Sequence, residues 1–242
     1  MHAAWSDATW GDLRPSTVET HPGAGLEEWT AHVTRAVVGP TPVRQVRWMD
    51  QVHGSTVLVS AAGGPRGPLP SPGREVEAVP AGSCDGLVSA DPSVAVSVLT
   101  ADCASIALGS PEGVFGAVHA GWRGLAGGVV EAAVAAMRAT GATEVVGALG
   151  PCIHAGCYEF SEGDLGHLAG AYGQGVVGRT TAGRPALDLR ATVSAALVAG
   201  GATETVGIDA CTACAGGYFS HRARRDSGRQ AMIVWSEGGA GG

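Results

Sequence analysis

The sequence has no run of about 18 apolar residues, the length that a membrane-spanning helix needs, so we expect no membrane partner. Its amino terminus lacks a charged segment followed by an apolar core, which argues against a secretory signal and favours a cytoplasmic location. Basic residues are also few, since 15 lysines and arginines stand against 22 acidic residues, for a net charge of −7. Proteins that bind nucleic acid usually carry a basic stripe, so a nucleic-acid partner is not expected.

Charged residues make up only 15% of the 242-residue chain, whereas hydrophobic residues make up 45%. That balance supplies a sizeable core and predicts a folded globular protein. We expect a single domain over residues 1–242, present as a monomer or a weak homodimer. Without an export signal, free thiols or metal ligands are a better interpretation of the cysteines than disulfides. The six cysteines are Cys84, Cys103, Cys152, Cys157, Cys211 and Cys214.

Alternating and continuous apolar runs predict the secondary structure. We expect strands over residues 42–49, 56–59, 86–89, 94–101, 114–118 and 230–235, and helices over 27–38, 125–140 and 189–198. Residues 61–82, rich in proline and glycine, predict a flexible loop, and the glycine-rich tail over 237–242 predicts a frayed end. The expected fold class is α/β, bordering on α+β: one compact domain with mixed sheets and helices packed outside.

Two similar segments follow two of these helices. GATEVVGAL begins at Gly141 and GATETVGID begins at Gly201, and each is followed by a pair of cysteines. We interpret the similarity as an internal duplication, with chance similarity in an Ala- and Gly-rich chain as the alternative. The four cysteines could form a structural zinc site, but burial as small apolar residues is the favoured interpretation. They are Cys152, Cys157, Cys211 and Cys214.

Cys103 and His119 each lie at the end of an apolar run that is predicted to be a buried strand, and His53 lies at the tip between two other strands. Two imidazoles and one thiolate are suitable zinc ligands, and three protein ligands leave a fourth position for water, as in catalytic sites. We therefore predict that these three residues are both metal ligands and catalytic residues. The alternative is two hydrogen-bonded histidines and a core cysteine.

A glycine-rich turn follows His119 and leads into the predicted helix over 125–140. Free amides at a helix start favour an anion, and Arg123 adds a charge and a planar fork of donors, so we predict that it binds phosphate. The alternative is that Arg123 pairs with a carboxylate such as Asp102. Asp102 itself is predicted to carry a proton or to orient a metal ligand. Two further candidates for phosphate or substrate binding are Arg222 and Arg229.

Seven motifs occur in order and together resemble one family. They are QVHG at 51–54, CDGLVS at 84–89, LTADC at 99–103, VHAGWRG at 118–124, GPCI at 150–153, CYEF at 157–160, and FS followed after seven residues by GR at 219–229. The combination of TADC with VHAGWRG is the most specific. From residue 42 to residue 236 the chain resembles the purine nucleoside phosphorylase family that was once called the multicopper polyphenol oxidase or laccase-domain family.

The resemblance implies a zinc-dependent, cytosolic enzyme that cleaves adenosine, inosine, guanosine and methylthioadenosine with phosphate. It also implies adenosine deaminase activity. The family's metal ligands correspond to His53, Cys103 and His119, with copper as a lower-ranked metal. The family fold is a compact α/β domain with an internal duplication.

Other functions remain open at this stage. Cys103 as nucleophile and His119 as base satisfy the arrangement of a cysteine hydrolase or deamidase. A copper polyphenol oxidase ranks lower, because the sequence has too few clustered histidines for a trinuclear copper centre. The sequence neither supports nor excludes a non-enzymatic role.

Overall fold

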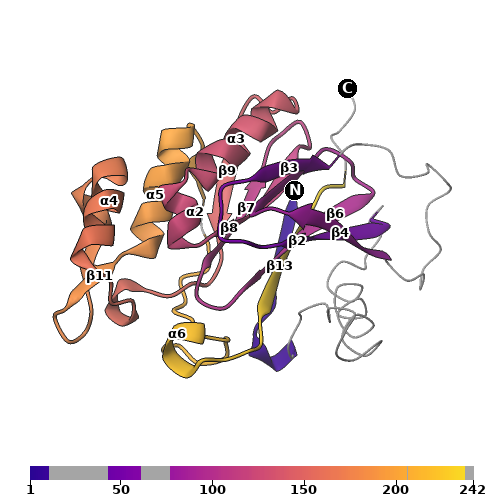
Figure 1. Cartoon of the computed structure of the whole chain (residues 1–242). Coiled ribbons are helices and arrows are strands. Elements are labelled where there is room, and N and C mark those ends of the chain that lie inside the picture. Colours follow the sequence, from indigo (N-terminus) through magenta and orange to yellow (C-terminus); the bar gives the residue numbers. More distant parts are fainter. Residues whose placement is uncertain (11–42, 61–76, 206, 238–242) are drawn as a thin grey trace.

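The computed structural model describes residues 1–10, 43–60, 77–205 and 207–237, and the following account concerns these residues. Two sheets of mixed strand direction form most of the fold (Figure 1). The five-stranded sheet has the order β1 (His2–Trp5), β13 (Gln230–Trp235), β6 (Val94–Thr100), β2 (Gln45–Asp50) and β4 (Glu77–Ser83). The six-stranded sheet has the order β12 (Thr203–Glu204), β9 (Val146–Leu149), β7 (Ala104–Gly109), β8 (Phe115–Ala120), β5 (Gly86–Ser89) and β3 (Val57–Ser60).

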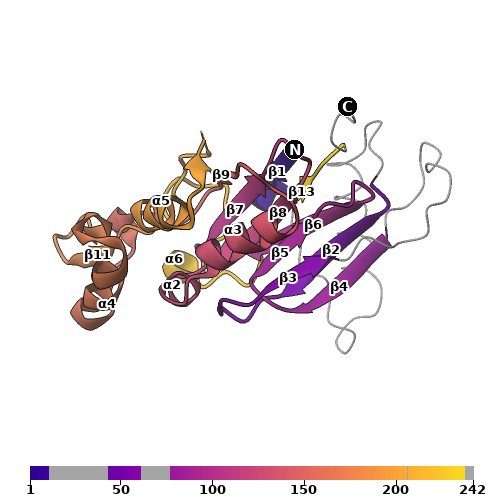
Figure 2. The same ribbon diagram turned by 90° about the horizontal axis from the view of Figure 1, so that it is seen from above.

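The remaining elements lie mainly on the outer side of the six-stranded sheet. A two-stranded ribbon pairs β10 (Val177–Arg179) with β11 (Pro185–Leu187). The helices are α2 (Trp122–Ala126), α3 (Val129–Ala139), α4 (Glu162–Tyr172), α5 (Leu189–Gly200) and α6 (His221–Arg224), with short 3₁₀ turns at Ala8–Trp10, Ala155–Cys157 and Gln174–Val176. Figure 2 shows α3 crossing the six-stranded sheet, with α5 and α4 following on the β9 side. Among the helices in the described part of the chain, none has the length and apolar character of a bilayer span.

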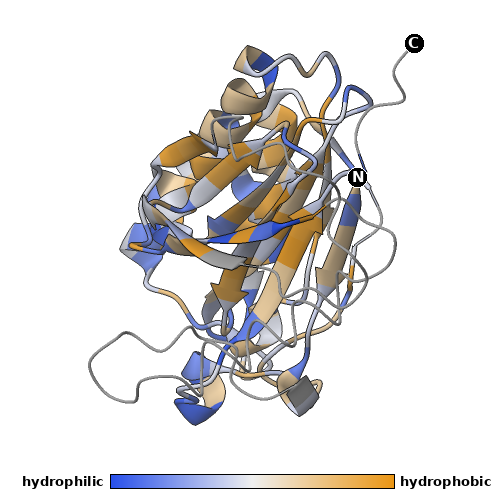
Figure 3. Cartoon of the chain, turned by 90° about the vertical axis from the view of Figure 1, so that its right-hand side faces the viewer, coloured by the Kyte–Doolittle hydropathy of each residue, from blue (hydrophilic) through white to orange (hydrophobic). Residues whose placement is uncertain are grey.

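The central strands β5, β7 and β8 of the six-stranded sheet bury both faces, because the sheet lies between helices and the second sheet. On β7, Ile106 and Leu108 belong to the core beneath the helices, whereas Ala107 belongs to the core between the sheets. On β8, Val118 belongs to the core beneath the helices and Phe115 to the core between the sheets. This alternation follows from the two-residue period of a strand. Figure 3 shows hydrophobic residues concentrated along the strands of these layers.

The structure confirms an α/β fold with mixed sheets. The predicted strands over 86–89 and 230–235 have the predicted bounds, and those over 42–49, 56–59, 94–101 and 114–118 differ by one to three residues at their ends. The strands β1, β7, β10 and β11 and the helices α4 and α6 were not predicted. The predicted helix over 27–38, most of the predicted loop over 61–82, and the tail over 238–242 lie outside the described residues.

Two predictions of secondary structure are wrong. The end of the expected loop is the strand β4, which runs parallel to β2 with Pro80 beside Trp48. A proline is tolerated there because β4 is at the edge of the sheet, where a missing N–H costs no ladder bond. The expected helix over 125–140 is two helices, because Gly128 takes a left-handed conformation with φ of 78° after α2.

The similar segments lie side by side. The helices α3 and α5 contact each other, and Thr203 of β12 pairs in parallel with Val146 of β9. Each helix is followed by a glycine with positive φ, 113° at Gly141 and 76° at Gly201, as expected at a helix terminus. The local repeat is therefore helix, left-handed glycine and strand in both copies.

Candidate metal centre and substrate pocket

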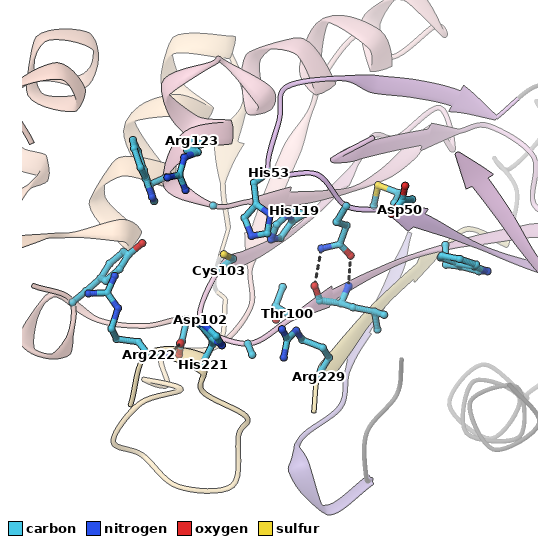
Figure 4. A pocket seen from close by; sticks show the side chains of 18 residues that line it. Asp50, His53, Thr100, Asp102, Cys103, His119, Arg123, His221, Arg222 and Arg229 are labelled. Atoms are coloured by element: carbon cyan, nitrogen blue, oxygen red, sulfur yellow. Dashed lines mark hydrogen bonds between the residues drawn. The ribbon is translucent and has the colours of Figure 1, made fainter. Parts of the chain in front are cut away.

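A cavity of about 480 Å³ opens where the loops after β2, β6 and β8 approach the segment that contains α6 (Figure 4). All seven residues that the sequence predicts for the site line it. They are His53, Asp102, Cys103, His119, Arg123, Arg222 and Arg229. The rest of the lining includes Gln51, Trp122, Tyr158 and His221, which come from the same loops and from the segment after β9. Residues separated by up to 181 positions in the chain, from Trp48 to Arg229, therefore face one space.

Three donor atoms gather at the inner end of this cavity. One ligand atom each from His53, Cys103 and His119 lies within 4.8 Å of the other two. The imidazole rings are 4.7 Å apart between centroids and nearly perpendicular, at 83°. Their surroundings differ, since His53 is exposed, Cys103 is half-buried and His119 is 2% exposed. Two imidazoles and a thiol at this spacing fit a metal such as zinc with a small adjustment of side chains.

The backbone around the cluster takes unusual conformations. His53 is left-handed with φ of 59°, and Asp102, just before Cys103, has φ of 91°. At Gly121 a Cβ atom would lie 3.2 Å from both Cys103 Sγ and the His53 ring, so a side chain there would crowd the cluster. Such conformations persist only where the surrounding structure fixes them.

Gln51 supplies part of this fixation for the loop that carries His53. Its amide nitrogen donates to the Leu99 carbonyl oxygen, and its amide oxygen accepts from the Leu99 N–H, both at 2.8 Å (Figure 4). This pair of hydrogen bonds ties the β2–β3 loop to β6, which leads to Cys103.

Asp85 contacts two of the three donor residues, and the sequence did not point to it as a site residue. Its carboxylate is 0% exposed and accepts backbone N–H groups from His53 at 2.9 Å and Gly54 at 2.6 Å. His119 Nδ1 lies 2.7 Å from the same carboxylate, so its Nε2 is left to face the cluster. The available signal was an aspartate directly before a fully buried strand, within CDGLVS, where an unpaired carboxylate would be costly.

The charges in the cluster support one another. Burial opposes ionisation of Cys103, but attraction to His119 and hydrogen bonds from both histidines lower the pKa of its thiol from 9.0 to about 6. Burial likewise opposes the charged form of His119, but the Cys103 thiolate and Asp85 raise its pKa to about 9. Without a metal the cluster is therefore a thiolate–imidazolium pair at neutral pH. A thiolate is also the form of cysteine that binds metal.

Asp102 does not contact Arg123, contrary to the alternative considered from the sequence. Its carboxylate accepts the Thr212 hydroxyl at 2.7 Å and the Arg222 backbone N–H at 2.6 Å, and the residue is 7% exposed. Both oxygens are thus engaged, and the contacts link the turn before Cys103 to the start of α6. This geometry favours a positioning role for Asp102 over proton transfer.

The three arginines enter the cavity from different elements. Arg123 is in the first turn of α2, not before a helix as expected, and its guanidinium lies 4.4 Å from the centre of the Trp122 ring. Arg222 lies 4.8 Å from the ring centre of Tyr158 and donates to the Glu159 carbonyl oxygen. Stacking on aromatic rings orients a guanidinium while leaving its edge available to an anion.

Arg229 is held differently from the other two. Its Nη1 donates to the backbone carbonyl oxygens of Asp226, Ser227 and Gly228 at 2.8–3.2 Å. These bonds close the loop between α6 and β13 and place the guanidinium at the cavity wall below Thr100 in Figure 4.

The comparisons with known proteins agree with the motifs. The profile of the family described as multi-copper polyphenol oxidoreductase laccase matches residues 26–237. The chain is 40% identical over 216 residues to the purine nucleoside phosphorylase ORF3 of Streptomyces griseus, covering 88% of this chain and 80% of that protein. It is 35% identical over 201 residues to the purine nucleoside phosphorylase Rv2149c of Mycobacterium tuberculosis, covering 81% of this chain and 74% of that protein.

Solved structures show the same fold. Protein NMB0706 of Neisseria meningitidis superposes with a TM-score of 0.73 at 27% identity, covering 94% of this chain and 86% of that one. YlmD of Geobacillus stearothermophilus superposes with a TM-score of 0.71 at 26% identity, covering 88% of this chain and 80% of that one. Because the family profile spans most of the sequence, this chain belongs to the multi-copper polyphenol oxidoreductase laccase family.

Proposed function

We propose that this protein is a zinc-dependent purine nucleoside phosphorylase, with adenosine, inosine, guanosine and methylthioadenosine as its substrate class. The observation that supports this most is the convergence of a His–Cys–His donor set and three arginines on one cavity. The relatives are named purine nucleoside phosphorylases, which supports purine nucleosides as the substrate class. Adenosine deamination is the second activity that we propose for this cavity.

The donor set suits zinc as the resident metal. Thiolate and imidazole are ligands that zinc prefers, and three protein ligands leave one position open. His53, Cys103 and His119 would hold the ion, and Asp85 would fix the ring of His119 through Nδ1. When bound, zinc supplies Lewis-acid activation inside the cavity.

The remaining residues suit phosphorolysis. In this reaction a phosphate oxygen attacks C1′ of the ribose, the bond from C1′ to the purine nitrogen breaks, and the purine leaves with a proton. Arg123, Arg222 and Arg229 would bind and orient the phosphate, because a guanidinium offers paired donors to phosphate oxygens. Asp102 would position Arg222 by accepting a hydrogen bond from the backbone N–H of Arg222.

Product analysis tests this proposal directly. Purified protein loaded with zinc is incubated with adenosine, with and without inorganic phosphate, and the products are separated by chromatography. Release of adenine that depends on phosphate, together with ribose 1-phosphate, is the expected result. Formation of inosine reports deamination. Adenine release at the same rate without phosphate would contradict phosphorolysis.

Arg123→Lys is expected to weaken phosphate binding while leaving zinc in place. Lysine keeps the charge but loses the fork, and a lost charge-assisted hydrogen bond predicts a rise of about tenfold in the KM for phosphate. Deamination needs no phosphate and should change less. Arg179→Lys, on the distant strand β10, is the matched control. Equal loss of both activities together with loss of zinc would instead indicate that Arg123 braces the metal loop.

The thiolate–imidazolium pair favours one second candidate, a hydrolase or deamidase with Cys103 as nucleophile and His119 as base. Such a nucleophile must be free of metal, because a bound ion would occupy the sulfur. Stoichiometric zinc bound by Cys103 in the active protein would therefore exclude this candidate. Full hydrolase or deamidase activity after removal of zinc would support it.

The pH dependence of alkylation tests the ion pair itself. In protein stripped of metal, the rate of Cys103 alkylation by iodoacetamide should reach half its maximum at about pH 6, because the thiolate forms above the lowered pKa. Zinc should protect the thiol. Mass spectrometry of the Cys103 peptide measures the rate, with Cys103→Ser as the blank. A midpoint near the ordinary thiol value of about 8.5 would contradict the pair.

A further inference from the structure

A second group of thiols lies outside the substrate cavity. The Sγ atoms of Cys157, Cys211 and Cys214 lie within 4.8 Å of one another, and all three cysteines are free. Tetrahedral zinc with bonds of about 2.3 Å to sulfur places sulfur atoms about 3.8 Å apart, so small side-chain movements would complete such a site. Cys152 is fully buried and is not in this group, unlike in the four-cysteine site considered from the sequence.

A backbone hydrogen-bond donor faces the sulfur of Cys211. Its Sγ accepts the backbone N–H of His154 at 3.4 Å. The Cys211 carbonyl oxygen also accepts the Ala215 N–H at 2.9 Å, which closes a tight turn over the Cys-x2-Cys spacing. An N–H group that donates to a sulfur favours the charged, metal-binding form of the cysteine, whereas a cysteine that only fills space needs no donor.

We propose that Cys157, Cys211 and Cys214 bind a second zinc ion, separate from the cavity. Three thiolates select a soft ion such as zinc over magnesium or calcium. Cys211 is buried and Cys157 is half-buried, while Cys214 is exposed, so the fourth position faces solvent at the Cys214 side. The nearest cysteine of the repeat, Cys152, is not a ligand.

The position of the group suggests what this ion would do. Cys157 directly precedes Tyr158, which lines the cavity beneath Arg222. Cys211 directly precedes Thr212, whose hydroxyl donates to Asp102. The ion would therefore link two separate segments of the cavity wall and stabilise them, without taking part in a reaction step.

Metal analysis in a Cys103→Ser background tests the second site independently of the first. This variant removes the thiolate of the cavity and should still bind about one zinc ion per chain after loading and dialysis. Adding Cys157→Ser should abolish the remaining binding, whereas adding Cys152→Ala should not. Cadmium gives an independent readout through its sulfur-to-metal absorption. This absorption should persist in the Cys103→Ser protein and disappear when Cys157→Ser is added to it. The loaded Cys103→Ser protein should also melt at a higher temperature than after treatment with a chelator.

Several results would overturn the second site. The first is absence of zinc from the loaded Cys103→Ser protein. The second and third are retention of zinc after Cys157→Ser is added to Cys103→Ser, and loss of zinc after Cys152→Ala is added to it. The fourth is a disulfide within the group in intact-mass measurements of the protein as purified. Failure of the cavity site looks different, since Cys103→Ser would then bind as much zinc as the unsubstituted protein.

Discussion

His119→Ala is expected to remove most of the zinc from the cavity and most of the phosphorolysis. Two remaining ligands, His53 and Cys103, rarely hold zinc, and the imidazolium that favours the Cys103 thiolate is lost as well. The affinity for zinc at this site should fall by at least about 100-fold. Metal analysis and the initial rate of adenine release measure the two effects.

His119 is buried, so its replacement could also reduce folding, and a second variant separates the two causes. His53 is exposed and left-handed, and asparagine tolerates that backbone conformation better than alanine. His53→Asn should therefore lose zinc and activity in a folded protein. His167→Ala, an exposed histidine on α4, is the control that should change neither. Full occupancy of the cavity site in both His119→Ala and His53→Asn would rule out the proposed ligand set.

Asp85→Asn is expected to combine a large loss of stability with weaker metal binding. The carboxylate is fully buried. It accepts hydrogen bonds from Nδ1–H of His119 and from the backbone N–H groups of His53 and Gly54. An asparagine would turn an NH₂ group toward these donors and leave some of them unpaired. Breaking a buried pair in this way typically lowers the free energy of unfolding by about 3–5 kcal/mol. Loss of the partner that orients a metal-binding histidine typically weakens affinity by roughly 10- to 100-fold.

Urea unfolding and zinc competition with a chromophoric chelator measure these effects. Asp91→Asn is the matched control, because Asp91 also accepts a backbone N–H, from Ser93 before β6, but does not line the cavity. It should change the free energy of unfolding by no more than about 1 kcal/mol. A stable Asp85→Asn protein with unchanged zinc affinity would show that His119 is oriented by other contacts.

The stability contribution of Asp85 also has a defined pH dependence. Although burial disfavours its charge, hydrogen bonds from His119, Gly54 and His53 and attraction to His119 lower its pKa below 3.8. A depressed carboxyl pKa stabilises the fold above the unfolded pKa, and this contribution is lost as the pH falls through the folded value. The difference in unfolding free energy between the unsubstituted protein and Asp85→Asn should therefore shrink below about pH 4.

The sequence by itself determined the strands that carry the site. The run from Val94 to Thr100 is rich in apolar, β-branched residues, which favour a buried strand, and Cys103 follows its end. His119 likewise lies near the end of β8, and the motifs around both residues were sufficient to predict them as members of one site. Local patterns of this kind depend only on nearby residues, which is why they could be read along the chain.

The tertiary structure decided which distant groups meet. Asp85 contacts His119 across 34 positions, and Asp102 contacts Thr212 across 110 and Arg222 across 120, and no period or spacing encodes these distances. Such pairs exist because neighbouring strand ends and loops converge after the sheets have packed. The meeting of Cys157 with Cys211 has the same origin, since the segments after β9 and β12 are brought together by parallel pairing of those strands. The sequence therefore determined which residues could donate to a metal, and the packing of the sheets determined which other residues contact them.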